Sequence, residues 1–194
     1  MDSGAERPRP HGLGAAFDEV IAAARAGQPA AWDQLFRVLA PGVRGYVRMQ
    51  GATDPDDLVS EVFLSVFRGI GSFSGDEAGF RSWVFVIAHR RLQDARRARA
   101  RRPQTSGADA TTAAPAASSA EDEALRDLAT DRVHALCAQL VPDQRDVLLL
   151  RILGDLTVDQ VADVLGKSAG AVKQLQRRGL EAIRRLSARE GVPL

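Results

Sequence analysis

The sequence predicts an all-α protein made of two small helical domains joined by a flexible linker, and three observations support this. Apolar residues recur at three- and four-residue spacing along most of the 194 residues, and no stretch alternates with the period of a β-strand. The stretch 103–120 is rich in Ala, Ser, Thr and Pro, and cannot bury enough apolar area to offset its ordering entropy. Residues 156–186 have the pattern of a helix, a glycine-containing turn and a basic helix, which is typical of a helix-turn-helix.

These observations divide the chain into four segments. We expect a disordered leader over residues 1–14, a helical domain over 15–102, the linker over 103–120 and the helix-turn-helix domain over 121–188. Hydrophobic residues make up 45% of the chain but aromatic residues only 5%, so the cores must rely on Ala, Val and Leu.

The first domain begins with an amphipathic segment, and a break at Gln28-Pro29 separates it from a second helix. The run Asp54-Pro55-Asp56-Asp57 predicts a further helix start, because carboxylates favour the positive end of the helix dipole and Pro fits the first turn. The expected helices span 17–26, 30–39, 56–67 and 80–102, with another start at Pro41 and a glycine-rich loop over 69–79.

In the second domain, we expect helices over 121–140 and 143–153, followed by the helix-turn-helix. Its first helix is predicted to begin at a capping box of Thr157 and Gln160. Gly166 permits the left-handed conformation that ends a helix, and Ser168 can cap the next one. An apolar stripe on the second helix then faces inward, which leaves its polar residues facing outward: Lys173, Gln174, Gln176, Arg177 and Arg178.

This outward face suits the major groove of DNA, because Lys can donate to guanine acceptors and Gln can pair with adenine. Arg177 and Arg178 lie further along the helix, where phosphates are the more natural contact. The alternative is a solvated surface helix without a ligand, and the preceding turn disfavours it.

A second basic surface is predicted on the helix 80–102. The stretch 81–102 contains eight Arg and one acidic residue, although the net charge of the whole chain is only +1. Phe73 in the glycine-rich loop and Trp83 lie just upstream of most of these arginines, and a positive groove beside aromatic side chains is typical of single-stranded nucleic acid binding. The alternative for Trp83 and Phe85 is a place in the core.

The order of these features resembles the extracytoplasmic-function group of bacterial sigma factors. The resemblance rests on DPDDLVSEVFLSVFRGIGSF, on FRSWVFVIAHRRLQDARRARARR and on VPDQRDVLLLRILGDLTVDQVADVLGKSAGAVKQLQRRGLEAIRRL, in this order, and covers most of residues 26–186. It implies a subunit that brings RNA polymerase to promoters and has no catalysis of its own. Leu175 stands where many members have Arg, so the promoter sequence that is recognised stays open.

The resemblance also implies roles for individual residues. The helix 56–67 would dock on the β′ clamp helices of core polymerase, with the β flap as a second contact; the candidate residues are Asp57, Leu58, Glu61, Val62 and Leu64. The loop and following helix would melt the minus-ten element and capture a base; the candidates are Ser72, Phe73, Ser74, Arg81, Trp83, Arg90, Arg91, Arg96 and Arg97. The minus-thirty-five element would be read by Ser168, Lys173, Gln174, Arg177 and Arg178.

Other functions receive less support. A one-component DNA-binding regulator would account for residues 141–186 but would leave 54–102 unexplained. The three histidines are scattered, no metal-binding spacing or nucleophile motif appears, and the single cysteine, Cys137, excludes an internal disulfide and a Cys-based zinc site. We therefore expect no enzyme, no cofactor and no metal.

The expected partners are core polymerase and promoter DNA, and the resemblance leaves room for an anti-sigma factor. No apolar run approaches the length that spans a bilayer, and the N-terminus lacks the core of a signal peptide. We therefore expect a cytoplasmic protein that does not contact a membrane.

Overall fold

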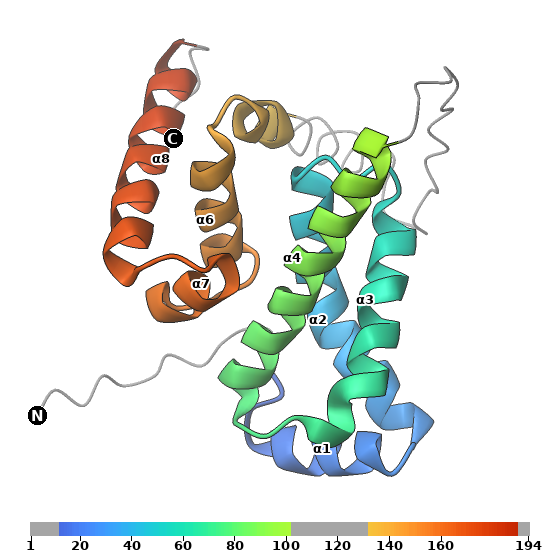
Figure 1. Cartoon of the computed structure of the whole chain (residues 1–194). Helices are drawn as coiled ribbons and strands as arrows, with labels where there is room; N and C mark the ends of the chain where they lie inside the picture. Colours follow the sequence, from blue (N-terminus) through green and yellow to red (C-terminus); the bar gives the residue numbers. More distant parts are fainter. Residues whose placement is uncertain (1–11, 102–131, 190–194) are drawn as a thin grey trace, which may run out of the picture.

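A computed structural model describes residues 12–101 and 132–189, and every regular element in these two ranges is a helix (Figure 1). The predicted all-α fold is thus confirmed. Most of the predicted leader, the whole linker and the start of the predicted helix 121–140 lie outside the described residues.

Four α-helices and two short 3-10 turns form the N-terminal domain (Figure 1). Helix α1 crosses one end of the domain, while α2, α3 and α4 run along its length. In chain order the elements are η1 (Gly14–Ala16), α1 (Phe17–Arg25), α2 (Pro29–Met49), α3 (Pro55–Gly69), η2 (Ile70–Ser72) and α4 (Glu77–Arg101).

Helix α2 differs from the prediction, because it continues through Pro41 and does not end at residue 39. Proline removes the hydrogen bond to the carbonyl of residue 37, but Pro41 and Arg37 both lie on the exposed side, where water can satisfy that carbonyl. On the opposite side Leu39 and Val43 are buried on either side of the proline. Their packing holds one continuous helix.

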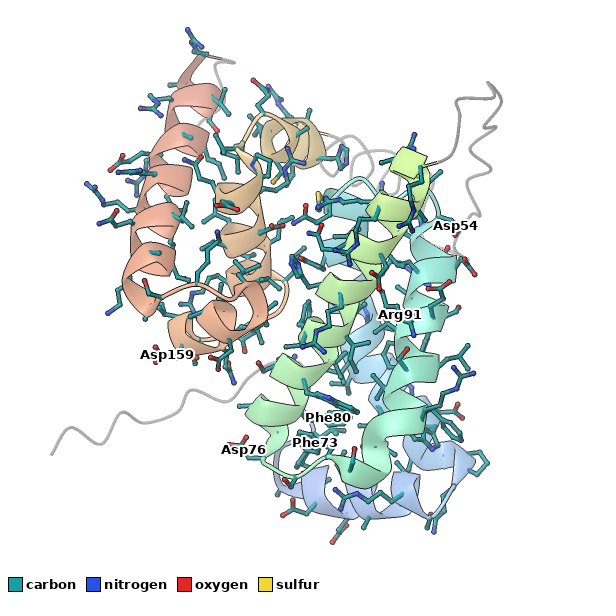
Figure 2. All side chains as sticks on the ribbon, in the orientation of Figure 1. Asp54, Phe73, Asp76, Phe80, Arg91 and Asp159 are labelled. Atoms are coloured by element: carbon teal, nitrogen blue, oxygen red, sulfur yellow. The ribbon has the colours of Figure 1, made fainter. Side chains whose placement is uncertain are left out.

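The predicted start of α3 is confirmed. The side chain of Asp54 accepts a hydrogen bond from the backbone amide of Asp57 at 2.9 Å, and Pro55 occupies the first turn (labelled Asp54, Figure 2). Helix α4 begins earlier than predicted, at Glu77, because the carboxylate of Asp76 accepts from the amide of Gly79 at 2.8 Å. The predicted glycine-rich loop is correspondingly shorter.

The C-terminal domain contains a helical stretch over residues 132–138, then α6 (Pro142–Ile152), α7 (Val158–Leu165) and α8 (Ala169–Arg189). The capping box of Thr157 and Gln160 is present at the start of α7, and Gly166 is left-handed with φ of 63°, so both predictions are confirmed. The amide of Ala171 donates to the Ser168 hydroxyl at 3.2 Å, as expected for a cap.

The two domains pack against each other, with α6 and α7 lying along α2 and α4 (Figure 1). Their buried apolar side chains form one continuous core. Phe85 of α4 belongs to this core and is 1% exposed, whereas Trp83 is half-buried. Cys137 is also buried, and burial raises the pKa of its thiol, which disfavours the reactive thiolate.

Candidate polymerase and nucleic-acid interfaces

The loop between α3 and α4 rests on an aromatic cluster. The Phe73 ring packs edge-on against Phe80, with 5.0 Å between centroids, and lies 5.5 Å from the centroid of Trp83 (Figure 2). Phe80 is fully buried and joins this cluster to the core, while Phe73 and Trp83 keep part of their surface exposed. The cluster therefore holds the loop in place and leaves aromatic surface beside it.

Arg25 at the end of α1 fixes the same loop from the other side. Its Nε donates to the carbonyl of Ile70 at 3.2 Å, and its guanidinium also donates to the carbonyl of Phe73. Within the loop, the Ser72 hydroxyl donates to the carbonyl of Gly69 at 2.8 Å, and Ser74 is exposed. The predicted base-capture residues thus lie together on one anchored turn.

Several arginines of α4 make contacts within the domain, which revises the predicted arginine track. Arg91 donates to the Ser65 hydroxyl on α3 at 2.9 Å, and Arg96 donates to the backbone and side-chain oxygens of Gln50 (labelled Arg91, Figure 2). Arg90 and Arg97 are exposed. Arg97 also forms an ion pair with Asp94, and its hydrogen bond holds the pKa of Asp94 below the usual range.

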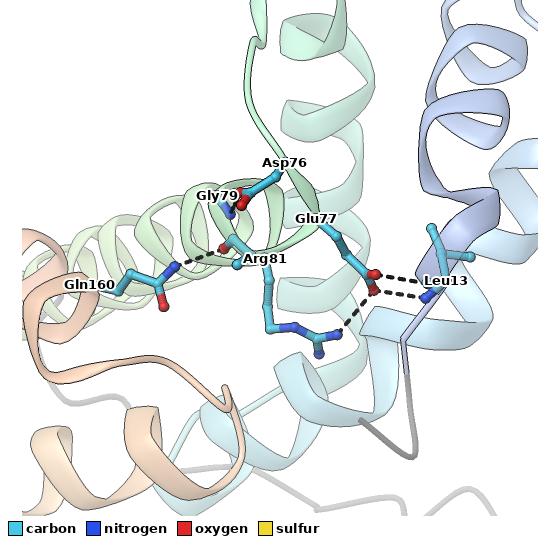
Figure 3. Close-up of polar contacts among 8 residues, drawn as sticks. Leu13, Asp76, Glu77, Gly79, Arg81 and Gln160 are labelled. Carbon is cyan, nitrogen blue, oxygen red and sulfur yellow. Dashed lines mark hydrogen bonds and ion pairs between the residues drawn. The ribbon is translucent and has the colours of Figure 1, made fainter. Parts of the chain in front are cut away.

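Arg81 points into the protein, although the sequence placed it among DNA contacts. Its guanidinium pairs with the Glu77 carboxylate at 3.5 Å, and the residue is 7% exposed. The same carboxylate accepts from the backbone amides of Leu13 at 2.7 Å and Gly14 at 2.9 Å (Figure 3). Glu77 therefore ties the chain before α1 to the start of α4, Arg81 pairs with it within α4, and the burial of Arg81 makes it a poor candidate for a DNA contact.

The predicted polymerase surface on α3 splits into exposed and buried residues. Asp57, Glu61 and Leu64 are exposed, and Leu64 has 53% of its surface accessible. Leu58 and Val62 lie about 100° further around the helix, on the side that faces the other helices, and are buried there.

Next to Leu64 on α3, the structure adds an aromatic patch that the sequence did not single out. Phe67 is 55% exposed and lies 4.9 Å from Trp32 of α2, and Phe36 of α2 is 43% exposed and lies 4.7 Å from Phe63. An exposed apolar patch beside carboxylates is typical of a protein-binding surface.

Helix α8 presents the residues expected to read DNA. Lys173, Gln174, Arg177 and Arg178 are exposed, and Val172 and Gly179 are buried on the opposite face. A Cβ on Gly179 would lie 2.8 Å from Cδ1 of Leu148, so the glycine allows α8 to lie close to α6. Figure 1 shows α8 on the side of its domain that faces away from α4.

Comparisons with known proteins agree with this arrangement. The Sigma-70 region 2 family matches residues 35–102, and the Sigma-70 region 4 family matches residues 137–185. The ECF RNA polymerase sigma factor BldN of Streptomyces coelicolor is 30% identical over 182 residues, which cover 93% of this chain and 69% of BldN. This chain belongs to the ECF RNA polymerase sigma factors.

A further relative supports this assignment, and a solved structure shares the fold. The ECF RNA polymerase sigma factor ShbA of Streptomyces griseus is 33% identical over 137 residues, covering 68% of this sigma factor and 71% of ShbA. The solved structure of CnrH in complex with the cytosolic domain of CnrY shares the fold, with a TM-score of 0.63 at 23% identity over 88% of this chain and 96% of that chain.

Two features of the candidate sites were not predicted from the sequence of this sigma factor. Arg25 lies 45 residues before Ile70, and no local pattern connects them. The aromatic patch combines residues of α2 and α3, and their helical spacing looks the same as that of core residues.

Among the described residues, no group of three or more His, Cys, Asp or Glu side chains could hold a metal ion, and no helix is long and apolar enough to cross a membrane.

Arg25→Ala should loosen the loop of this sigma factor without unfolding its domain, because the carbonyls of Ile70 and Phe73 lose their donor. Hydrogen exchange of the amides over residues 70–76 should become faster, and exchange in α6 to α8 should not change. The control is Arg37→Ala, which removes an exposed arginine of α2. Unchanged exchange in the loop of the Arg25 variant would show that Arg25 does not anchor it.

Proposed function

We propose that this sigma factor directs core RNA polymerase to promoters by three surfaces, and that it catalyses no step itself. The observation that supports this most strongly is the pairing of two features in one chain. An acidic and apolar surface on α3 is suited to a protein partner, and a helix-turn-helix with an exposed basic face is suited to duplex DNA. A regulator that acts without polymerase would need only the second.

The polymerase contact is proposed to lie on α3. Asp57 and Glu61 are one helical turn apart and both exposed, so their carboxylates can meet a basic surface together. Leu64 and Phe67 continue the same side with apolar area that a partner could bury. The proposed partner surface is the β′ clamp helices, with the β flap as a second contact of the C-terminal domain.

The minus-ten element is proposed to be melted at the loop between α3 and α4. Capturing a base costs a few kcal/mol of lost stacking, so a loop that is already fixed in shape loses less conformational entropy on binding. Arg25 and the Phe73 cluster fix this loop in the free chain. Ser74 and the exposed part of Phe73 are proposed to contact the base, and Arg90 and Arg97 the phosphates.

The minus-thirty-five element is proposed to be read by the N-terminal part of α8. Lys173, Gln174 and Arg177 project from the first turns of this helix, where a helix docked in the major groove meets base edges. Ser168 caps the helix through the Ala171 amide and can approach a phosphate from there. An anti-sigma factor that covered any of these three surfaces would inhibit initiation, and action on polymerase and DNA implies a cytoplasmic site.

Reversing both acidic residues, Asp57→Arg with Glu61→Arg, should weaken binding to core polymerase, because like charges would then face the basic partner surface. The affinity for core polymerase is measured with the whole chain, and circular dichroism verifies the fold. The control reverses Asp18 and Glu19, an exposed acidic pair on α1, so that the change in net charge is equal. Equal affinity of the α3 double variant and this control would place the polymerase contact elsewhere.

Lys173→Ala should reduce discrimination at one base pair by roughly 1–3 kcal/mol, because Lys173 lies where base edges are read. Arg178→Ala should weaken all promoters about equally and lower the salt slope by about one unit, since one phosphate contact is lost. Both are measured with the holoenzyme on a set of promoter variants. The opposite result, a uniform loss for Lys173→Ala and altered preference for Arg178→Ala, would mean that α8 is oriented differently in the groove.

A further inference from the structure

The loop between α3 and α4 is attached at both of its ends to the same short helix. Arg25, the last residue of α1, donates to the carbonyls of Ile70 and Phe73, where the loop begins. At the other end of the loop, Glu77 is the first residue of α4, and its carboxylate accepts from two successive backbone amides just before α1 (Figure 3). One helix of nine residues thus joins the two ends of the loop.

The turn before α1 has the geometry of an anion-binding nest. Leu13 is in the right-handed helical region, with φ of −80° and ψ of −23°, and Gly14 follows in the left-handed region with φ of 55°. Such a pair of conformations points successive backbone amides at one spot, where an anion binds. The two carboxylate oxygens of Glu77 take one amide each, at 2.7 Å from Leu13 and 2.9 Å from Gly14. Two directed hydrogen bonds therefore fix the position of this carboxylate.

Two glycines make room for the contact. A Cβ on Gly12 would lie 2.9 Å from Oε1 of Glu77, a distance at which the carboxylate would have to move. Gly14 has a positive φ, and any residue with a Cβ is strained there. The chain before α1 is therefore suited to holding Glu77 and not only to leading into the helix.

Between its two attachments, α1 packs beneath the aromatic cluster. The Phe17 ring of α1 lies 5.9 Å from that of Phe80, which packs edge-on against Phe73 in the loop. Because the hydrogen bonds of an α-helix keep its length fixed, α1 also fixes the separation of the two points that it holds. We call α1 with the contacts of Arg25 and Glu77 the α1 brace.

Glu77 is a poor candidate for a DNA contact of its own. Its carboxylate would repel phosphates, both of its oxygens already accept hydrogen bonds, and the guanidinium of Arg81 lies 3.5 Å from one of them. The effect of Glu77 on DNA must therefore pass through the loop that it helps to hold.

We propose that Glu77 is a positioning residue for promoter melting, which through the α1 brace keeps the minus-ten loop in the shape that captures a base. The role in melting rests on the proposed function, whereas the brace itself does not. A loop that is braced before binding loses less conformational entropy when it captures a base, so more of its binding free energy offsets the lost stacking. Binding to core polymerase does not depend on the brace, because the exposed residues of α3 take no part in it.

Two variants release the contact from opposite sides. Glu77→Gln keeps the shape of the side chain but replaces one acceptor oxygen with an NH2 group, which cannot accept from an amide. Gly14→Ala places a Cβ in the left-handed turn that forms the nest.

Each variant has a matched control. Glu19→Gln makes the same chemical change at an exposed carboxylate in the first turn of α1. Gly51→Ala adds a Cβ at φ of 77° between α2 and α3, where nothing lies within 4 Å, so it introduces the same kind of backbone strain away from the loop. Circular dichroism verifies that all four variants are folded.

The first measurement is hydrogen exchange in the free full-length chain. The amides over residues 70–76 should exchange faster in Glu77→Gln and in Gly14→Ala, and exchange in α6 to α8 should not change. The double variant should not exceed the larger single effect, because both substitutions break one contact. Unchanged exchange in the loop of both variants, or an equal increase in the controls, would overturn the brace.

The second measurement is run-off transcription by the holoenzyme from a promoter that it transcribes in a genomic library. One template is the duplex, and the other has its template strand mismatched over the minus-ten element, so that this element is already open. Both variants should yield roughly 2- to 10-fold less product than the parent from the duplex. They should match the parent on the mismatched template, where no melting has to be offset, and in their affinity for core polymerase.

The two templates separate a positioning role from a loss of structure. Equal losses from both templates, or no loss from either, would overturn the role of Glu77 in melting and leave the proposed function intact. A parent chain that gives no product with core polymerase from any template would instead overturn the proposed function and the role in melting with it. The exchange result would still decide whether the brace exists.

Discussion

The fold depends on α4 packing on two sides at once. Phe80, Val84, Phe85, Ala88 and Leu92 are buried along this helix, and at about 25 cal/mol per Å² of apolar surface their burial is a large part of what holds α2 and α3 to it. Its first turns also meet α7 through Ala78, and Phe85 reaches the turn after α6. The arginines occupy the rest of the surface of α4. The core, the contact between the domains and the proposed nucleic-acid surface thus share one helix.

This sharing explains how the arginine-rich half of α4 stays helical. Arg91, Arg96 and Arg99 each donate to an oxygen on a neighbouring segment, at Ser65, Gln50 and Thr53, so these three guanidinium groups have partners within the domain. The consequence for function is that fewer arginines are available for phosphates than the sequence alone indicates. The exposed Arg90 and Arg97 remain the better candidates.

The sequence was sufficient for features that local chemistry determines. The helix start at Asp54-Pro55, the Thr157 capping box and the left-handed Gly166 each depend on residues a few positions apart, and all three were predicted. The continuity of α2 through Pro41 was not predicted, because tertiary packing outweighs the local cost of a proline that faces solvent. Leu58 and Val62 were assigned to a partner surface but are buried in the domain. The spacing of apolar residues along a helix does not say which of its faces the rest of the protein covers.

The contact between the two domains could not be predicted from the sequence. Gln50 donates a hydrogen bond to Asp146 across this contact, but the two are 96 residues apart, and neither lies in a motif that indicates pairing. Gly42 looks like an ordinary glycine within a helix, but a Cβ there would lie 2.8 Å from the backbone oxygen of Leu153 in the other domain. Burial of a polar pair across two domains is set by how those domains meet, which a pattern of apolar spacing does not encode.

The central claim is that this chain works as a promoter-specific initiation subunit whose two domains act on one polymerase. The most direct measurement is run-off transcription from a genomic promoter library by purified core polymerase, with and without the full-length chain. Transcripts from defined start sites that appear only when the chain is added are the predicted result. Binding of the chain alone to specific duplex sites, with no transcripts in the presence of core polymerase, would contradict the account and indicate a one-component regulator.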